Sequence, residues 1–244
     1  MAAEHSPLDQ FAIKRFADLQ LGGIDVSFTN SSAMMVAVIV LVTLFMTLSM
    51  RRHAMVPGRW QLLAELSYEF IAKTVRDSIG SEGKRYFPFV FTLFMFVLFS
   101  NMLGLIPHSF TVTSHIIVTF ILAAAIFIGA TVLGFVRHGL KFFTFFLPPG
   151  VPVFLAPLLV PIELVSYLSR PVSLSVRLAA NMLAGHTMLA VFAGFVVALG
   201  VFGIAPFVFI VLLYGLETLV AFLQAYVFAV LTCIYIGDSI HLHH

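Results

Sequence analysis

Charged side chains are scarce in this chain of 244 residues, because Asp, Glu, Lys and Arg together make up only 10% of it. Soluble domains average about 25% charged and about 45–50% apolar residues, whereas 61% of this sequence is hydrophobic. A water-soluble fold of about 250 residues still exposes roughly a quarter of its chain surface, so it could not hide this much apolar area. The composition excludes a soluble enzyme, a nucleic-acid-binding protein and a disordered tail. It predicts an integral membrane protein.

Cysteine is nearly absent as well. The single cysteine, Cys233, excludes a disulfide framework and a multi-cysteine metal site, and we expect it to fill space within a helix. The net charge of +2 is too small to indicate a nucleic-acid partner. The N-terminus has four acidic residues before any apolar run, so it does not resemble a secretory signal or an Arg-rich transit peptide.

The positions of the few charges predict a topology. Runs of about 20 apolar residues, enough at about 1.5 Å per residue to cross about 30 Å of hydrocarbon, predict transmembrane helices. These runs are 32–50, 87–106 and 115–136. Segments 51–86 and 137–141 hold nine Lys and Arg residues, whereas the link 107–114 holds none. The positive-inside rule therefore predicts that the two basic segments face the cytoplasm or matrix, and that residues 1–31 form an outer-side segment.

Within the inner-side segment, residues 59–79 have the pattern of an amphipathic helix. Charged residues such as Glu69 and Lys73 occupy one side. Apolar residues recur at helical spacing on another, namely Leu63, Leu66, Phe70 and Val75, with Trp60 and Ile71 nearby. The pattern predicts a helix that lies on the inner membrane interface or packs against a neighbouring subunit, with the surface anchor favoured.

The C-terminal half predicts a less regular architecture. Five prolines between 145 and 162 predict that residues 137–160 form an inner loop and a broken, Pro-rich re-entry segment. Residues 161–238 then form two apolar segments that are both longer than the about 30 Å that a bilayer requires. A steeply tilted, antiparallel helical hairpin accommodates that excess length. The predicted fold class is an all-α integral membrane protein.

Polar residues on this hairpin indicate the function. On an ideal helix, Glu163, Arg170, Arg177 and Asn181 fall within an arc of about 80°. An ionisable side chain at membrane depth costs between about 2.5 and more than 10 kcal/mol. Such residues therefore normally line a water path or pair with one another.

Folding the hairpin about residues 201–202 adds a second constraint, because it sets residues of the two arms at the same level. The predicted neighbours are His186 with Glu217, Gln224 with Arg177 and Asn181, and Asp238 with Glu163. An outer and an inner titratable pair would then flank Arg177. Its side chain stays protonated because the pKa of arginine exceeds about 12. A permanent cation would interrupt a continuous proton wire, hold a mobile carboxylate and separate two half-pathways.

Two other functions stay open on these residues alone. The first is a secondary transporter whose midplane site holds an anionic substrate on Arg177. Such transporters are expected to have broken helices in repeat-related positions, and no second half of the chain resembles 161–238. The second is a non-catalytic membrane scaffold, which would leave the intramembrane Arg and Glu unexplained.

Several runs resemble the signature of subunit a of the F-type ATP synthase, the membrane stator beside the rotating c-ring. They are SRPVSLSVRLAANMLAGHTML (169–189), SNMLGLIPHSFTVTSH (100–115), FFLPPGVP (145–152) and YGLETLVAFLQAYVFAVLTCIYI (214–236). Together they span most of 87–236. The spacing R-x-x-x-N-x-x-x-x-H, with a downstream E-x-x-x-x-x-x-Q, is the most specific part of the resemblance.

The resemblance implies roles for individual positions. Arg177 matches the family's essential arginine, which faces the c-ring carboxylate and prevents a proton short circuit. His186 and Glu217 match a pair in the entry half-channel. The other matches are Asn181 beside the arginine, Gln224 at its level on the last helix, Glu163 in the inner half-channel and Asn101 as a lining residue. Asp238 is included in the predicted proton pathway because it is expected beside Glu163, although an interfacial anchor is an equal alternative for it.

The resemblance thus implies a proton-translocating stator subunit that couples proton flow to rotation and ATP synthesis, and that is not an enzyme on its own. The implied partners are the c-ring, the peripheral-stalk b subunits, other ATP synthase subunits and the lipid bilayer, with no nucleic acid. No cofactor and no metal are expected. The expected location is a bacterial inner membrane, with the mitochondrial inner membrane as the alternative.

Overall fold

The computed structural model describes residues 15–17, 20–21, 24–25, 27–51, 57–106, 109–139, 141–142 and 153–240. In this part of the chain, five helices are long and apolar enough to cross a membrane. They are α1 (Asn30–Ser49), α3 (Phe87–Gly104), α4 (Ile116–His138), α5 (Ala156–Leu199) and α6 (Ile204–Ile240). The sixth long helix, α2 (Arg59–Ile79), is much more polar. The predicted all-α membrane fold is therefore confirmed.

Short elements precede and connect these helices. Within the described residues, the 3₁₀ segments are η2 (Ser81–Arg85), η3 (Val112–Ser114), η5 (Val153–Leu155) and η6 (Gly200–Gly203). The strands described before α1 are β1 (Arg15–Ala17), β2 (Gln20–Leu21), β3 (Ile24–Asp25) and β4 (Phe28–Thr29). Strands β1 and β4 pair antiparallel, with Arg15 opposite Thr29, and β2 pairs antiparallel with β3. Much of the predicted outer-side segment 1–31 lies outside the described residues.

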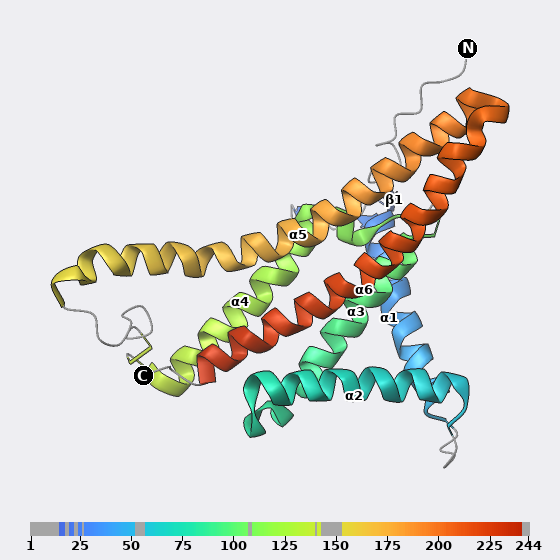
Figure 1. Cartoon of the computed structure of the whole chain (residues 1–244). Helices are drawn as coiled ribbons and strands as arrows, with labels where there is room; N and C mark the ends of the chain where they lie inside the picture. Colours follow the sequence, from blue (N-terminus) through green and yellow to red (C-terminus); the bar gives the residue numbers. More distant parts are fainter. Residues whose placement is uncertain are drawn as a thin grey trace.

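Helix α2 runs crosswise to α1 and α3 at one end of the bundle (Figure 1). The ends of α4 and α6 lie on the same side. Arg137 near the end of α4 forms an ion pair with Glu82 in η2, and the His138 ring forms a 3.2 Å hydrogen bond with the carbonyl of Ile240 in α6. The basic segments that sequence analysis assigns to the inner side therefore lie together.

Only part of the apolar side that the sequence indicated on α2 is buried. The buried stripe contains Ala64, Ile71 and Val75, whereas Leu63 and Leu66 are about half exposed. These exposed leucines lie on a side of the helix that the protein does not cover. The helix thus has two apolar faces, one packed on the protein and one available to the bilayer interface.

Small residues bring α6 close to its neighbours in the core. Ala221, Ala225, Ala229 and Cys233 recur every fourth residue along α6, and each is fully buried. Side chains of this size let helix backbones approach closely, as is typical of packing within membranes. Ala225, Ala229 and Cys233 belong to one apolar cluster that also includes Phe94 of α3. The expectation that Cys233 fills space within a helix is confirmed.

Helices α5 and α6 form an antiparallel hairpin whose turn is η6 (Figure 1). With 44 and 37 residues, they are about 66 and 55 Å long at about 1.5 Å per residue. Both are far longer than the about 30 Å hydrocarbon core, so we expect them to cross it obliquely. At the turn, Gly200 has a φ of 54°, and Gly203 packs so closely on Val196 that a side chain there would meet its backbone.

Proline interrupts α5 less than the sequence suggested. The helix begins at Ala156 and continues through Pro161 and Pro171, although it changes direction part-way along its length (Figure 1). The rest of the predicted re-entry segment includes residues 143–152, which lie outside the described residues. Pro171 lacks the N–H that would bond to the carbonyl of Tyr167. The hydroxyls of Ser169 and Ser175 donate to the carbonyls of residues 166 and 172, and not to that of Tyr167.

Candidate functional site

The middle part of the polar stripe of α5, residues 173–181, is exposed on the outward face of the hairpin. Arg177 and Asn181, one turn apart, are exposed, as is Ser173. The adjacent face of the helix is buried and includes Leu178 and Met182. Among the described residues, the Arg177 guanidinium forms no hydrogen bond and no ion pair. A cation so placed within an apolar helix is available to a group outside this chain.

Glu217 of α6 points its carboxylate into the hairpin. Both carboxylate oxygens are buried, and neither accepts a hydrogen bond from any described residue. The carboxylate packs against Gly185 of α5, where an added methyl group would overlap Oε1. Burying a carboxylate without donors is costly, so it contributes nothing to stability. Glu217 is therefore a candidate functional residue.

His186 lies next to Gly185 and therefore at the level of Glu217, as the register of the hairpin suggested. The two side chains are not hydrogen-bonded to each other, because neither Glu217 oxygen has a partner. Instead, the Nε2 atom of His186 lies 3.1 Å from the hydroxyl of Thr111. Thr111 precedes η3 in the segment that connects α3 to α4.

Asn101 links α3 to the same region. Its side chain is completely buried, and its Nδ2 donates a 3.1 Å hydrogen bond to the carbonyl of Ala221, one turn beyond Glu217. Its Oδ1 atom and the neighbouring Ser100 hydroxyl are buried without a partner among the described residues. Buried polar atoms of this kind are normally satisfied by ordered water. Glu217, His186, Thr111 and Asn101 thus form a polar zone inside an otherwise apolar bundle.

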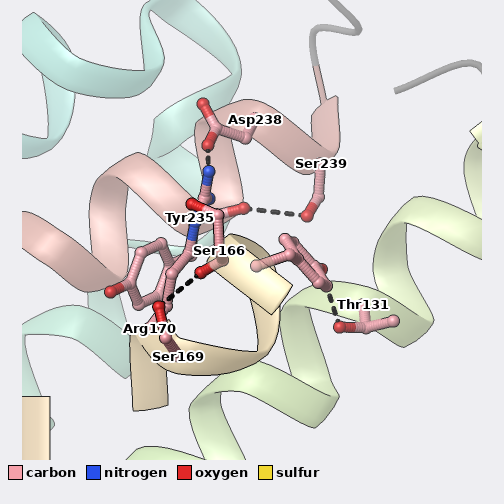
Figure 2. A network of polar contacts seen from close by, with 8 residues as sticks. Thr131, Ser166, Ser169, Arg170, Tyr235, Asp238 and Ser239 are labelled. Carbon is pink, nitrogen blue, oxygen red and sulfur yellow. Dashed lines mark hydrogen bonds and ion pairs between the residues drawn. The ribbon is translucent and has the colours of Figure 1, made fainter. Parts of the chain in front are cut away.

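Arg170 and Asp238 connect the open end of the hairpin. Arg170 Nη1 lies 2.9 Å from Asp238 Oδ2, and Figure 2 shows the guanidinium reaching from α5 to the carboxylate on α6. The guanidinium carbon is 5.2 Å from the ring centre of Tyr167 and 5.5 Å from that of Tyr235. The Tyr167 hydroxyl in turn lies 2.8 Å from that of Thr131 on α4. This network joins α4, α5 and α6.

The ion pair corrects one expectation. Sequence analysis set Asp238 beside Glu163, but Asp238 pairs with Arg170, which lies two turns from Glu163 along α5. Two carboxylates repel each other, whereas Arg170 offers the opposite charge. Glu163 itself is partly exposed on α5, and it remains a candidate lining residue.

Gln224 is partly buried on α6. The contact between Gly185 and Glu217 sets the local register of the hairpin. In that register, Gln224 lies at the level of residues 177–178. The structure thus distributes the predicted site residues over three levels: a buried zone toward the turn, an exposed cation in the middle and a polar network at the open end.

Sequence reasoning missed several members of these groups. Thr111 and Ser100 did not enter the predicted site, and the partner of Arg170 was not identified. The cluster of hydroxyl-bearing residues in TVTS (111–114), between two apolar helices, is the signal that could have indicated Thr111. No group of three or more His, Cys, Asp or Glu residues suited to a metal ion occurs within the described ranges.

Comparison with known proteins identifies the family. Residues 32–237 match the family described as the ATP synthase A chain. The chain belongs to this family. It is similar to the ATP synthase subunit a of Pelagibacter ubique (strain HTCC1062), with 56% identity over 241 residues that cover 98% of this chain and 99% of that protein.

Other bacterial members of the family are equally similar. Identity with the ATP synthase subunit a of Paramagnetospirillum magneticum (strain ATCC 700264 / AMB-1) is 55% over 245 residues, which cover 98% of this chain and 99% of the relative. Identity with the ATP synthase subunit a of Rhodospirillum rubrum is 54% over 240 residues, which cover 98% of this chain and 100% of the relative. The family resemblance is therefore confirmed, as is the expectation of an ATP synthase component and not an enzyme on its own. Membership also favours this function over the transporter alternative.

Proposed function

We propose that the chain provides two offset proton half-channels in the membrane sector of an ATP synthase, with Arg177 between them. His186 and Glu217 lie on the outer half-channel, and Glu163 lies on the inner one. The partner of Arg177 is a carboxylate on a ring of c subunits. The observation that carries the proposal is the contrast between Arg177, exposed without an ion-pair partner in the described chain, and Glu217, buried without a donor.

The outward face of α5 supports a helical partner beside Arg177. A shallow groove there is lined almost entirely by apolar or small residues: Ala180, Leu183, Ala184, Thr187, Met188, Val191 and Phe192. Small residues such as Ala180 and Ala184 allow another helix to approach closely in a membrane. The only charge on this part of α5 is Arg177, so an acidic group on the partner helix would complement it.

The mechanism follows from which groups can exchange protons. A proton entering at His186 and Glu217 passes to the ring carboxylate, which becomes neutral and can turn into the lipid. After almost a full turn of the ring, that carboxylate meets the field of Arg177 and ionises. The proton leaves past Glu163. Arg177 cannot carry the proton, because guanidinium does not lose its charge in proteins. Flow therefore has to pass through the rotating ring.

The membrane potential supplies the driving force. Each elementary charge that crosses gains about 2.3 kcal/mol per 100 mV. Rotation of the ring transmits this energy to the catalytic sector, where ATP is made. Peripheral-stalk b subunits hold the chain against the torque, and the bacterial relatives support a location in a bacterial inner membrane.

Replacement of Arg177 tests the proposal directly. We expect that Arg177→Ala abolishes proton-driven ATP synthesis by membrane vesicles, while the chain still co-purifies with a ring of c subunits. Arg76→Ala, which removes an exposed arginine from α2, serves as the matched control and leaves synthesis unchanged. Coupled synthesis in an assembled Arg177→Ala complex would overturn the proposal.

A further inference from the structure

Thr111 holds a fixed position against His186. Its side chain is 97% buried, and its hydroxyl lies 3.1 Å from His186 Nε2 and 3.3 Å from the carbonyl of Gly104. The backbone around it is tied down as well, since the Ser114 hydroxyl donates a 2.7 Å hydrogen bond to the Thr111 carbonyl. Thr111 is therefore a buried, well-fixed hydrogen-bond partner of His186 and not a surface residue that happens to lie nearby.

The end of α3 is shaped to receive Thr111. A Cβ atom on Gly104 would come within 2.6 Å of Thr111 Cγ2, closer than such atoms pack. Glycine at this position therefore allows the helix end to contact the threonine. That approach also brings the Gly104 carbonyl within reach of the threonine hydroxyl.

The two hydrogen bonds of the Thr111 hydroxyl form together only when Nε2 of His186 carries a proton. A carbonyl oxygen can only accept a hydrogen bond, so the single hydroxyl proton of Thr111 is donated to Gly104. The hydroxyl oxygen then accepts from Nε2–H of His186. A neutral imidazole has one N–H and one basic nitrogen, which makes Nδ1 the basic atom of the ring.

We propose that Thr111 is a positioning residue that orients the His186 ring and assigns proton exchange to its Nδ1 atom. The inference rests on the proposed role of His186 in the outer half-channel. When Nδ1 takes up a proton, the Nε2–H bond to Thr111 is kept and becomes charge-assisted, which stabilises the imidazolium. Loss of the Nδ1 proton restores the starting tautomer without ring rotation.

Other titratable groups lie on the elements packed against the helix of His186. From α6 these are Glu217, packed against Gly185, and Tyr214, whose hydroxyl donates to the carbonyl of Leu105. From the segment before α4, His115 stacks on Phe110 at 4.9 Å. Glu217 is the only carboxylate among them, and an anionic Glu217 would favour the imidazolium at the same level.

The test removes the Thr111 hydroxyl and keeps its shape. Thr111→Val in the complete ATP synthase complex is expected to slow proton flux through the membrane sector about tenfold, the equivalent of one lost hydrogen bond. The decline of flux with rising outer pH should also begin at a lower pH, because the imidazolium loses its acceptor. Thr111→Ser keeps a hydroxyl and should restore both the flux and the pH profile.

A matched control separates this role from packing. Thr119 is equally buried, but its hydroxyl donates to the Ile116 carbonyl of its own helix. Thr119→Val should therefore leave the pH profile unchanged. If Thr111→Val prevents assembly, comparison of Thr111→Ser with Thr111→Ala provides the same test. Equal loss in both, or a wild-type pH profile in Thr111→Val, would overturn the inference.

The same substitution in a His186→Ala complex distinguishes the failure of this inference from the failure of the proposed function. Thr111→Val should have no further effect on flux in a His186→Ala complex, because its partner is gone. Flux that is unchanged by His186→Ala would contradict the proposed role of His186. If His186→Ala reduces the flux and Thr111→Val reduces it further by the same factor as in the wild type, the proposed role of His186 stands. Only the role of Thr111 would then be overturned.

Discussion

The guanidinium of Arg170 and the carboxylate of Asp238 meet at 2.9 Å across the open end of the α5–α6 hairpin. The two residues are 68 positions apart in the sequence, and both side chains are about a quarter exposed. Tyrosine rings of α5 and α6 flank the guanidinium. The pair therefore holds together the two arms at the end farthest from their turn.

Breaking this ion pair should loosen the open end. Arg170→Gln and Asp238→Asn are each expected to cost about 1–3 kcal/mol, because each leaves a partly buried charge without its partner. The double variant should cost less than the sum of the two. A double-mutant cycle on thermal denaturation of the assembled complex measures the coupling. Strictly additive losses would show that the pair contributes no stabilising interaction.

Gly185 should be needed to keep the Glu217 carboxylate in position. A methyl group at Gly185 overlaps Oε1, which lies at the end of a flexible side chain and can move away. Gly185→Ala should therefore leave assembly intact and lower proton flux about tenfold by displacing the acid, a change of about 1.4 kcal/mol in the barrier. A methyl group added at Gly194 would have no neighbour within 4 Å. The Gly194→Ala complex should therefore conduct protons normally. Equal flux in both variants would argue against this packing role.

Neutralising Glu217 should slow proton entry. Glu217→Gln preserves size but removes a group that can exchange protons, so passive proton flux through the membrane sector should fall severely. Glu69→Gln makes the same chemical change on the exposed surface of α2 and should have no effect. The assay is acidification of vesicles whose catalytic sector has been stripped. Similar flux in the two variants would assign Glu217 a structural role only.

If a ring of c subunits packs on α5 as proposed, the exposed face of α5 predicts which positions contact it. Ala180 is exposed one turn from Arg177, whereas its neighbour Ala179 is only 5% exposed. A cysteine at 180 should form an oxidative cross-link with a cysteine near the carboxylate on a ring helix, and a cysteine at 179 should not. The native Cys233 is fully buried and gives little background. Preferential cross-linking at 179 would mean that the ring contacts a different face.

Composition and periodicity predicted the fold class because each spanning helix corresponds to one long apolar run in the sequence. The level of His186 with Glu217 was also predictable, since it needs only the turn position and a constant helical rise. The family followed from the spacing of Arg177, Asn181 and His186. These features depend on distances along single helices, which a sequence records directly.

Features that depend on how helices cross were not predictable. Counting residues from the turn set Asp238 opposite Glu163, because that count assumes two straight, parallel arms. The change of direction in α5 and the attraction to Arg170 altered the pairing. Likewise, α2 has two apolar faces, and only tertiary contacts decide that Ile71 is buried and Leu63 is not. The Thr111 contact similarly requires the α3–α4 connection to fold back onto α5.

The alanine-rich seam of α6 has a mechanical consequence. A partner that rotates against the outward face of α5 would push this helix sideways. The load would pass to α6 and, through side chains too short to bend, into α3. Ala225 and Ala229 belong to the same apolar cluster as Ile71 of α2. The force would therefore spread over the closely packed block of α2, α3 and α6, and not over one helix alone. We expect this block to act as the fixed bearing surface against which the rotor turns.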